Sequence, residues 1–142
     1  MVVVSSKKDV AREAIARGRI YLRRETIAAI REGTVVKGNV LATARVAAVL
    51  AVKDTARLIP FCHSIPVGGI TTDFDVSEEY IEATVGVVSY GKTGVEMEAL
   101  TGVSVALLTI WDMVKSAEKD ERGQYPVTRI DGIHVVEKRK GE

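Results

Sequence analysis

Residues 91–115, GKTGVEMEALTGVSVALLTIWDMVK, decide the fold: a turn bracketed by Gly91 and Gly94 leads into a long apolar segment. The segment fits a helical pattern, and only a few polar side chains interrupt it. Burying a carboxylate costs free energy unless the charge is paired, so acidic residues on such a helix need a reason. We therefore predict a long central helix that forms one wall of an active site.

The flanking sequence predicts strands where apolar and polar residues alternate, and helices where a glycine or an asparagine cap marks an end. The predicted elements, in chain order, are a strand over 11–22 with a bulge at Gly18, a helix over 24–33, a helix over 40–52 capped by Asn39, a hairpin of strands 70–76 and 80–90, the central helix, and a strand over 127–136. An edge strand is also predicted at 2–4, a loop at 58–66 and a frayed tail over 137–142.

This order is strand, helix, strand, strand, helix, strand, with a small helix inserted early. It is the order of a split βαβ arrangement, in which helices cover one face of an antiparallel sheet. The sequence therefore predicts an α+β fold, a ferredoxin-like sandwich, and its length predicts a single domain over residues 1–142.

The composition is that of an ordinary soluble globular protein, with 46% hydrophobic and 27% charged residues. The formal net charge of +1 gives no global attraction to nucleic acid or to a membrane. The single cysteine, Cys62, excludes an internal disulfide. Charged residues interrupt the central apolar segment too often for a membrane span. We expect a cytoplasmic protein that binds neither nucleic acid nor a membrane.

Residues 86–93, GVVSYGKT, satisfy the phosphate-loop pattern G-x-x-x-x-G-K-[ST]. The residues between the two glycines are mostly β-branched or aromatic, which suits a strand better than an open loop of backbone amides. The apolar run 107–112 ends in Asp112, as the magnesium-binding strand of an NTPase would, but it lies inside the helical pattern. We interpret the motif as an accident, and a P-loop NTPase stays as an alternative.

Three residues are candidates for acid–base chemistry. Lys37 precedes a helix N-terminus, where free backbone amides and the helix dipole attract anions, so it suits a phosphate-bearing ligand. Asp112 and Lys115 are three residues apart on one helix face, a standard arrangement for proton transfer. The alternatives are a solvated loop lysine and an exposed helix ion pair that contributes little stability. The apolar residues around Asp112 favour a partly closed setting.

Glu96 and Glu98 fit the positive end of the central helix, and capping would explain at least one of them. Glu98 and Asp112 are fourteen residues apart, which predicts that they share a helix face but lie about 21 Å apart along the axis. If both are functional, the site is elongated or is built from two subunits.

Cys62 and His63 lie in a loop bracketed by prolines. Together with the distant His134 they do not supply a recognisable ligand spacing, so no metal site is expected. A neutral His63 can hydrogen-bond a base or a phosphate, or it can be satisfied locally. Cys62 is expected to be a pocket wall rather than a nucleophile, because no activating base lies beside it in the sequence.

Together these segments resemble cyclic pyranopterin monophosphate synthases, the enzymes of the second step of molybdenum cofactor biosynthesis. The resemblance is carried by KGNVLATAR at 37–45, LIPFCH at 58–63, GKTGVEMEAL at 91–100 and TIWDMVK at 109–115. The order and spacing of these motifs fit the family over nearly the whole chain.

The resemblance implies a ferredoxin-like subunit in a homohexamer, a trimer of dimers with active sites between subunits. It implies conversion of a nucleotide-derived small molecule, 3′,8-cyclo-7,8-dihydroguanosine 5′-triphosphate, to cyclic pyranopterin monophosphate with release of pyrophosphate. It implies no cofactor beyond Mg²⁺ that could accompany the triphosphate. Asp112 matches the general acid/base, and Lys37 and Lys115 match the catalytic lysines. The matching substrate-binding residues are Arg12, Phe61, Cys62, His63, Glu96, Met97 and Glu98.

The sequence departs from the family pattern at three positions. Phe61 stands where leucine is usual, Ser64 where proline is common, and Val3 where some members carry aspartate. These changes affect details of the pocket and leave the acid–base residues in place. A second alternative is a non-enzymatic ferredoxin-like ring that binds a small anionic ligand or a partner protein.

Overall fold

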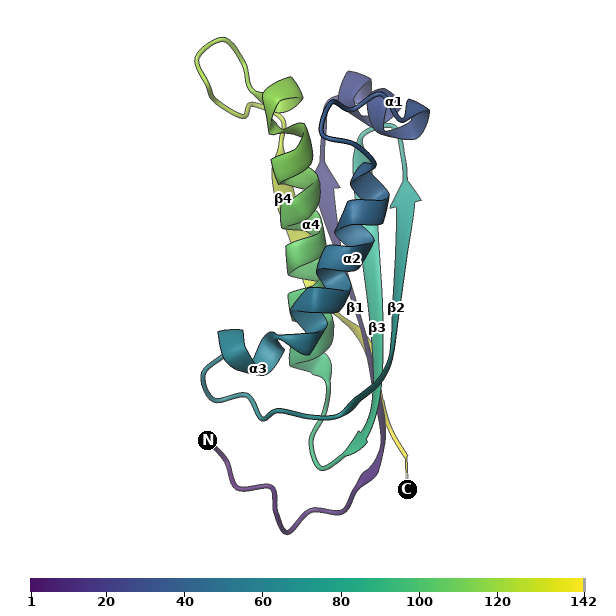
Figure 1. Cartoon of the computed structure of the whole chain (residues 1–142), viewed down its shortest axis with the longest axis vertical. Coiled ribbons are helices and arrows are strands. Elements are labelled where there is room, and N and C mark those ends of the chain that lie inside the picture. Colours follow the sequence, from purple (N-terminus) through teal and green to yellow (C-terminus); the bar gives the residue numbers. More distant parts are fainter. Residues whose placement is uncertain (142) are drawn as a thin grey trace.

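The computed structural model describes residues 1–141, which form one four-stranded sheet and four helices (Figure 1). The elements in chain order are β1 (Val10–Tyr21), α1 (Arg24–Glu32), α2 (Val40–Lys53), α3 (Thr55–Leu58), β2 (Val67–Val76), β3 (Tyr80–Gly91), α4 (Glu96–Glu118) and β4 (Arg129–Lys140).

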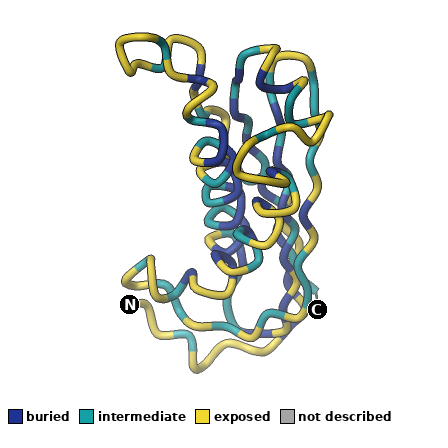
Figure 2. The backbone as a smooth tube through the Cα atoms, turned by 45° about the horizontal axis from the view of Figure 1, so that its top comes forward, coloured by how far each residue is buried: buried dark blue, intermediate teal, exposed yellow. Residues whose placement is uncertain are grey.

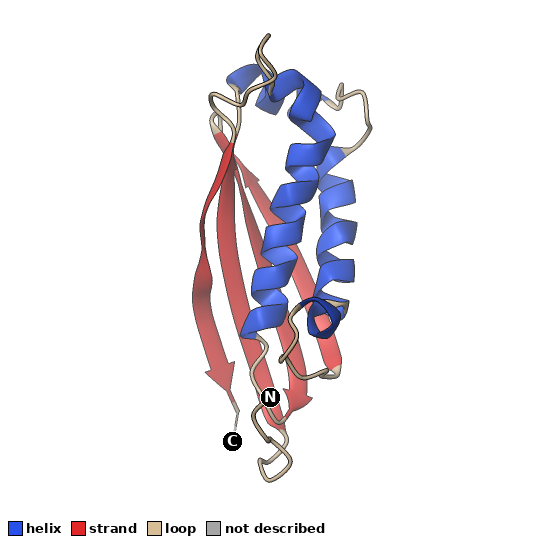
Figure 3. Cartoon of the chain, turned by 90° about the vertical axis from the view of Figure 1, so that its left-hand side faces the viewer, coloured by secondary structure: helices blue, strands red, loops and turns tan. Residues whose placement is uncertain are grey.

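All pairings in the sheet are antiparallel, and the strand order is β2-β3-β1-β4. The helices lie together on one face of the sheet (Figure 3). Along β1 every second residue is buried. The residues between them are half-buried, except for Ala11, which is exposed. This pattern is expected for a strand that is covered on one face. The predicted α+β ferredoxin-like sandwich is confirmed.

α4 lies close to the sheet and to α2, because two glycines leave room for side chains of the facing elements. A Cβ atom added at Gly102 would lie 2.9 Å from Val52 and 3.0 Å from Val85. A Cβ atom added at Gly18 would lie 3.1 Å from Leu107. The core gathers in the layer between the helices and the sheet (Figure 2).

The predicted helix ends are confirmed. α1 ends at Gly33, whose φ of 72° is in the left-handed region that glycine adopts readily. The Asn39 side chain accepts a hydrogen bond from the Ala42 backbone N–H at 3.0 Å and caps α2. The chain therefore turns sharply between α1 and α2, and Lys37 lies in this turn.

β4 is longer than predicted. The tail over 137–142 was expected to fray, but β4 continues to Lys140, and the Gly141 N–H donates to the Ala11 carbonyl at 2.7 Å; Glu142 lies outside the described residues. Arg139 lies opposite Glu13 and forms a 3.1 Å ion pair with it. Opposite charges across two strands stabilise a sheet, so this charged segment pairs without apolar residues.

Three other local predictions have mixed outcomes. The bulge at Gly18 is confirmed, because the register between β1 and β4 shifts between Arg17 and Arg19. The edge strand at 2–4 is wrong, since both edges of the sheet described over residues 1–141 are formed by β2 and β4. The loop over 58–66 is essentially correct, but the short helix α3 before it has no clear sequence signal.

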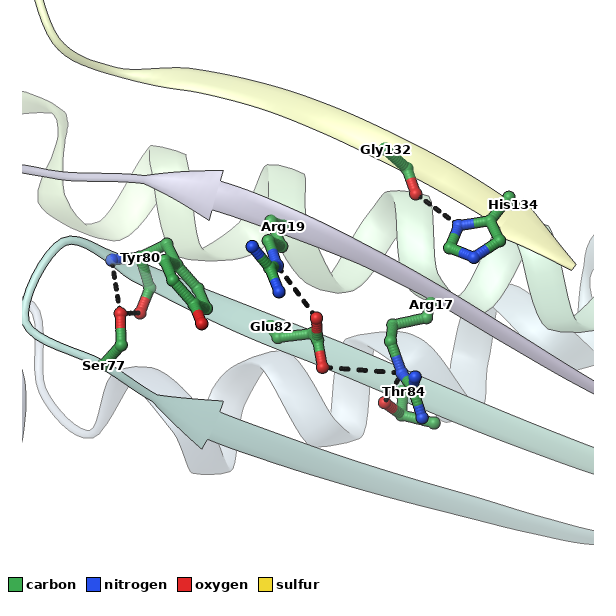
Figure 4. Close-up of polar contacts among 8 residues, drawn as sticks. All are labelled: Arg17, Arg19, Ser77, Tyr80, Glu82, Thr84, Gly132 and His134. Carbon is green, nitrogen blue, oxygen red and sulfur yellow. Dashed lines mark hydrogen bonds and ion pairs between the residues drawn. The ribbon is translucent and has the colours of Figure 1, made fainter. Parts of the chain in front are cut away.

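The face of the sheet away from the helices carries polar side chains that pair with one another (Figure 4). Arg19 Nε donates to Glu82 on β3 at 2.9 Å, and Arg17 Nε lies 3.5 Å from the same carboxylate. Arg17 Nε also donates to the Thr84 hydroxyl at 3.1 Å, and the Arg19 guanidinium lies 4.1 Å from the centroid of the Tyr80 ring. The arginines of this face are therefore satisfied within the chain.

α4 is long and apolar enough to cross a membrane when only length and composition are considered. In the structure, however, 50% of its most apolar window is buried inside the protein. The buried positions face the sheet and α2, and polar residues such as Asp112 lie on the opposite side. This is the pattern of a core helix in a soluble protein.

A buried carboxylate that the sequence analysis did not single out fixes the C-terminal end of α4. Glu118 is fully buried and accepts hydrogen bonds from the hydroxyls of Thr26 in α1 and Thr128 before β4. It also accepts a hydrogen bond from the Arg23 backbone N–H at 3.1 Å. Three donors compensate for the loss of water around the carboxylate. Glu118 therefore holds the start of α1 and the segment before β4 against α4.

We expect Glu118→Ala to lower the free energy of unfolding by about 3 kcal/mol, because it leaves three buried donors without their acceptor. Chemical denaturation of the two proteins measures the difference. Glu121→Ala, at an exposed position in the turn after α4, is the matched control and should change stability by less than about 0.5 kcal/mol. Equal denaturation midpoints for Glu118→Ala and the wild type would contradict the role of this carboxylate.

Candidate active site

Lys37, Asp112 and Lys115 meet beside the C-terminal half of α4. The Lys115 ammonium lies 2.9 Å from Asp112 Oδ1, and the Lys37 ammonium lies 3.1 Å from Asp112 Oδ2. Lys37 Nζ also donates to the Asp112 backbone carbonyl at 3.1 Å. Each carboxylate oxygen has its own lysine, so the three predicted acid–base residues form one cluster, the Lys–Asp–Lys group. Lys37 is therefore not an isolated loop lysine.

The Lys–Asp–Lys group is open to solvent in the single chain. Its three side chains each keep roughly half of their accessible surface, with 58% for Asp112. The expectation of a partly closed setting is wrong for one chain, because Met113 and Val114 are buried in the core. Trp111 packs edge-on against Tyr125, at 5.1 Å between ring centroids, rather than over the carboxylate.

The charges of the group shift the titration of its members. Hydrogen bonds from Lys115 and then Lys37 hold the pKa of Asp112 below its usual value. Asp112 in turn raises the pKa of Lys115. With two ammonium ions and one carboxylate, the group attracts an anion. An anionic ligand that engages the lysines would loosen their hold on Asp112 and free it to accept a proton.

Glu98 forms a second chemical feature at the N-terminal end of α4, where it is only 3% exposed. The Cys62 thiol donates to Glu98 Oε2 at 3.7 Å, whereas Oε1 has no hydrogen-bond partner within residues 1–141. Burial raises the pKa of Glu98, and burial followed by the charge of Glu98 raises the pKa of Cys62. A raised thiol pKa favours a pocket wall over a nucleophile at Cys62.

A cavity of about 440 Å³ lies between the proline-bracketed loop and the start of α4, and we call it the loop–helix cavity. Five of the predicted substrate-binding residues line it: Phe61, Cys62, His63, Glu96 and Met97. Glu98 lies behind Cys62, in contact with its thiol. The structure thus brings the binding residues of two distant sequence motifs to one place.

Arg12 lies apart from the loop–helix cavity. Its Nε donates to the Gly91 carbonyl at 3.0 Å, and its side chain lines another cavity, of about 600 Å³, together with Lys7. Lys7 lines both cavities, so the two adjoin. Sequence reasoning missed Lys7; the only signal for it was the pair of lysines at positions 7 and 8.

The Lys–Asp–Lys group and Glu98 lie towards opposite ends of α4, about 21 Å apart for a separation of fourteen residues. The prediction that Glu98 and Asp112 share a helix face fits the geometry of α4, although Glu98 is buried in contact with Cys62 and Asp112 is exposed. Fourteen residues are slightly less than four turns, so the two side chains differ by about 40° around the axis. One chain cannot bring both carboxylates to the same atom.

The phosphate-loop motif is part of the sheet. Gly86 and Gly91 both belong to β3, and Gly86 pairs with Ile15 of β1 and Thr71 of β2. Asp112 belongs to α4, so the run that imitates a magnesium-binding strand is helical. The backbone of a central strand is engaged in the sheet and cannot cradle phosphate, which disfavours the NTPase alternative.

The fold and the Lys–Asp–Lys group define a class: a ferredoxin-like enzyme equipped for acid–base chemistry on an anionic substrate. Comparison with known protein families narrows this class. The model of the MoaC family matches residues 1–141, and the chain belongs to that family.

Several proteins similar to this chain are named "Probable cyclic pyranopterin monophosphate synthase". The protein of Methanoregula boonei is 75% identical over 142 residues, which cover 100% of this chain and 92% of that protein. The protein of Methanocorpusculum labreanum is 72% identical over 141 residues, covering 99% and 89%. The protein of Pyrococcus abyssi is 64% identical over 140 residues, covering 99% and 88%. The resemblance inferred from the sequence motifs is confirmed.

We expect Lys37→Ala and Lys115→Ala each to raise the pKa of Asp112 toward its ordinary value of 3.8, with the larger effect from Lys115→Ala, whose hydrogen bond contributes most. NMR titration of the Asp112 side-chain carboxyl measures both shifts. Lys53→Ala, at the far end of α2, is the control. Should neither lysine variant move the titration of Asp112, the two ion pairs would not exist in solution.

Proposed function

We propose that this chain converts 3′,8-cyclo-7,8-dihydroguanosine 5′-triphosphate to cyclic pyranopterin monophosphate, with release of pyrophosphate, in molybdenum cofactor biosynthesis. The chain is then a lyase. Its membership of the MoaC family and the names of its relatives support this activity. The observation that carries the proposal is the Lys–Asp–Lys group, because it places an ionised carboxylate between two ammonium ions at hydrogen-bond distance.

In this proposal Asp112 is the general acid/base. Opening a purine-derived ring and rebuilding it as a pterin requires proton transfers at several atoms and no change of oxidation state by the protein. Lys37 and Lys115 stabilise negative charge that develops on the reacting oxygens. We propose that the enzyme holds no resident cofactor, and that any Mg²⁺ in the reaction enters with the triphosphate.

The base of the substrate is proposed to enter the loop–helix cavity. Cys62, His63 and Met97 line this cavity, and Phe61, which is 75% exposed, stands at its surface. The free Oε1 of Glu98 suits an N–H donor of the guanine-derived ring. An analogue without that donor would leave a buried acceptor unpaired, which is a strong basis for discrimination.

The separation of the two groups supports a site shared between two subunits. The midpoint between Glu98 and Asp112 in the sequence is Val105. A two-fold axis beside Val105, with two α4 helices antiparallel, would place the Glu98 end of one chain beside the Lys–Asp–Lys group of the other. Leu108, an apolar residue that is 57% exposed on α4, would be covered by this contact.

We therefore propose a homo-oligomer with intersubunit active sites, assembled in the cytoplasm as a homohexamer of three such dimers. In this arrangement the solvent-exposed Lys–Asp–Lys group becomes the wall of a cleft that the second subunit closes. Excluding water from the cleft strengthens the interaction of the lysines with an anionic substrate.

We expect Lys37→Ala and Lys115→Ala each to abolish product formation while the assembly survives, because both side chains are exposed and make no core contact. Turnover of the purified proteins is measured by product analysis, and assembly by size-exclusion chromatography with light scattering. Lys53→Ala is the control that should keep wild-type turnover. Near-normal turnover in either variant would refute the assigned roles, and a wild type without turnover would favour the non-enzymatic alternative.

We expect activity to return when inactive Lys37→Ala is mixed, after dissociation and reassembly, with inactive His63→Ala. If each site takes Lys37 from one chain and His63 from another, random mixing gives intact sites at about a quarter of the wild-type number. Activity of the mixture is compared with that of each variant taken through the same treatment. A mixture as inactive as its components would show that each site lies within one chain.

A further inference from the structure

Lys92 is the lysine of the phosphate-loop pattern, and its side chain has no part in the proposed reaction. It lies in the turn between β3 and α4, directly after the last residue of β3. Its Nζ lies 3.1 Å from Asp9 Oδ1 and donates to the Lys7 backbone carbonyl at 3.2 Å. Lys92 therefore contacts the chain's own carboxylate and carbonyl, and it joins the segment before β1 to the turn that precedes α4.

Residues 2–9, which we call the N-terminal strap, lie before the first strand and belong to no helix or strand. Within the strap, the Lys7 N–H donates to the Val4 carbonyl at 2.9 Å and closes a turn. In the part of the chain that the structure describes, the side chain of Lys92 makes the only hydrogen bond and ion pair that a side chain forms between the strap and the rest of the protein. The position of the strap thus depends on this one ammonium group.

The N-terminal strap forms one wall of the loop–helix cavity. Val2, Val4 and Lys7 line this cavity together with Cys62 and His63. The strap lies at the same end of the molecule as α3 and the turn between β3 and α4 (Figures 1 and 3). Val2 is 78% exposed, so it gains little from the protein's own core. A flat ring in the cavity would bury such apolar side chains, and their burial favours binding.

We propose that Lys92 is a positioning residue, which holds the N-terminal strap at the loop–helix cavity and so places Val2 and Val4 against the ring system of the bound substrate. The identity of the ring rests on the proposed function, whereas the hold on the strap does not. Lys92 touches no reacting atom and acts through the strap. A segment that is fixed before binding loses less conformational entropy when the ligand binds, so Lys92 increases affinity more than it changes the chemical step.

The first measurement is limited trypsin digestion of the full-length protein. Lys7 and Lys8 are cleavage sites within the strap, and cleavage there requires the strap to open locally. We expect Lys92→Ala to be cut at these sites about fivefold faster than the wild type, because it loses one exposed ion pair and one hydrogen bond. Mass spectrometry of the released N-terminal peptide identifies the site of cleavage.

Three further variants control this digestion. Lys92→Arg should keep the wild-type rate, because a guanidinium can donate to both the carboxylate and the carbonyl. Asp9→Ala/Lys92→Ala should be cut no faster than Lys92→Ala, because the two residues share one ion pair. Arg24→Ala should leave the rate unchanged, since it removes an exposed ion pair of 2.9 Å to Glu78 at the other end of β1. Lys92 is 40% exposed, so we expect all variants to keep the denaturation midpoint.

The second measurement is steady-state turnover of the same variants. Lys92→Ala should raise KM for the triphosphate substrate by about two- to fivefold, because the fraction of protein with a closed strap falls by no more than the strap opening rises. The kcat should change little, since the Lys–Asp–Lys group is untouched. Lys92→Arg should restore KM. A role in stability alone would lower the denaturation midpoint and leave KM as it is.

Equal cleavage rates in Lys92→Ala and the wild type would overturn the hold of Lys92 on the strap. Faster cleavage with an unchanged KM would overturn its positioning role for the substrate. A wild-type protein that converts no substrate would contradict the proposed function, whereas the digestion tests the strap without any turnover. The two proposals can therefore fail separately.

Discussion

α4 packs against β1, β3 and α2 at points where Gly18 and Gly102 leave room for side chains of the neighbouring elements. A helix of 23 residues is thereby held along its length, and the groups at its two ends keep a fixed separation. Both ends carry a buried carboxylate. Glu118 is satisfied by three donors, whereas Glu98 keeps one oxygen without a partner in the described part of the chain. Glu118 is therefore a carboxylate that stabilises the fold, whereas Glu98 keeps an acceptor oxygen that the described residues do not use.

The positions of the charged side chains indicate more about anion binding than the net charge of the protein does. The formal net charge is only +1, yet the cations are used in three ways. On the outer face of the sheet the arginines are paired within the chain, and in the Lys–Asp–Lys group two lysines share one carboxylate. A third set, Lys7, Lys8, Arg12 and Lys140, lines the cavity of about 600 Å³, which we call the basic cavity, and has no carboxylate partner among residues 1–141. Positive charge without a partner is therefore concentrated in one cavity of the described structure.

The sequence predicted the elements whose signals are local. Gly33 and Asn39 mark helix ends by their own backbone preferences, and alternation identifies the strands of the hairpin. The Lys–Asp–Lys group was also predicted, partly from the spacing of Asp112 and Lys115 and partly from the family resemblance. The contact of Lys37 with Asp112 depends on the packing of α2 against α4, which no local pattern contains.

What the sequence did not predict depends on partners far along the chain. The end of β4 looks like a charged tail until Glu13 is placed opposite Arg139. Glu118 looks like a surface residue until Thr26 and Thr128 are brought to it. The burial of Glu98 depends on the loop that carries Cys62, and the helical pattern of α4 holds no information on that loop.

The two ends of the chain converge at one end of the sheet, as the positions of the termini in Figures 1 and 3 show. Lys7 and Lys8 precede β1 and Lys140 ends β4, so the basic cavity is assembled from both ends. An affinity tag or a fusion partner attached at either terminus would therefore stand next to this cavity and bring its own charges to it. Untagged protein is the appropriate material for any measurement of anion affinity on this enzyme.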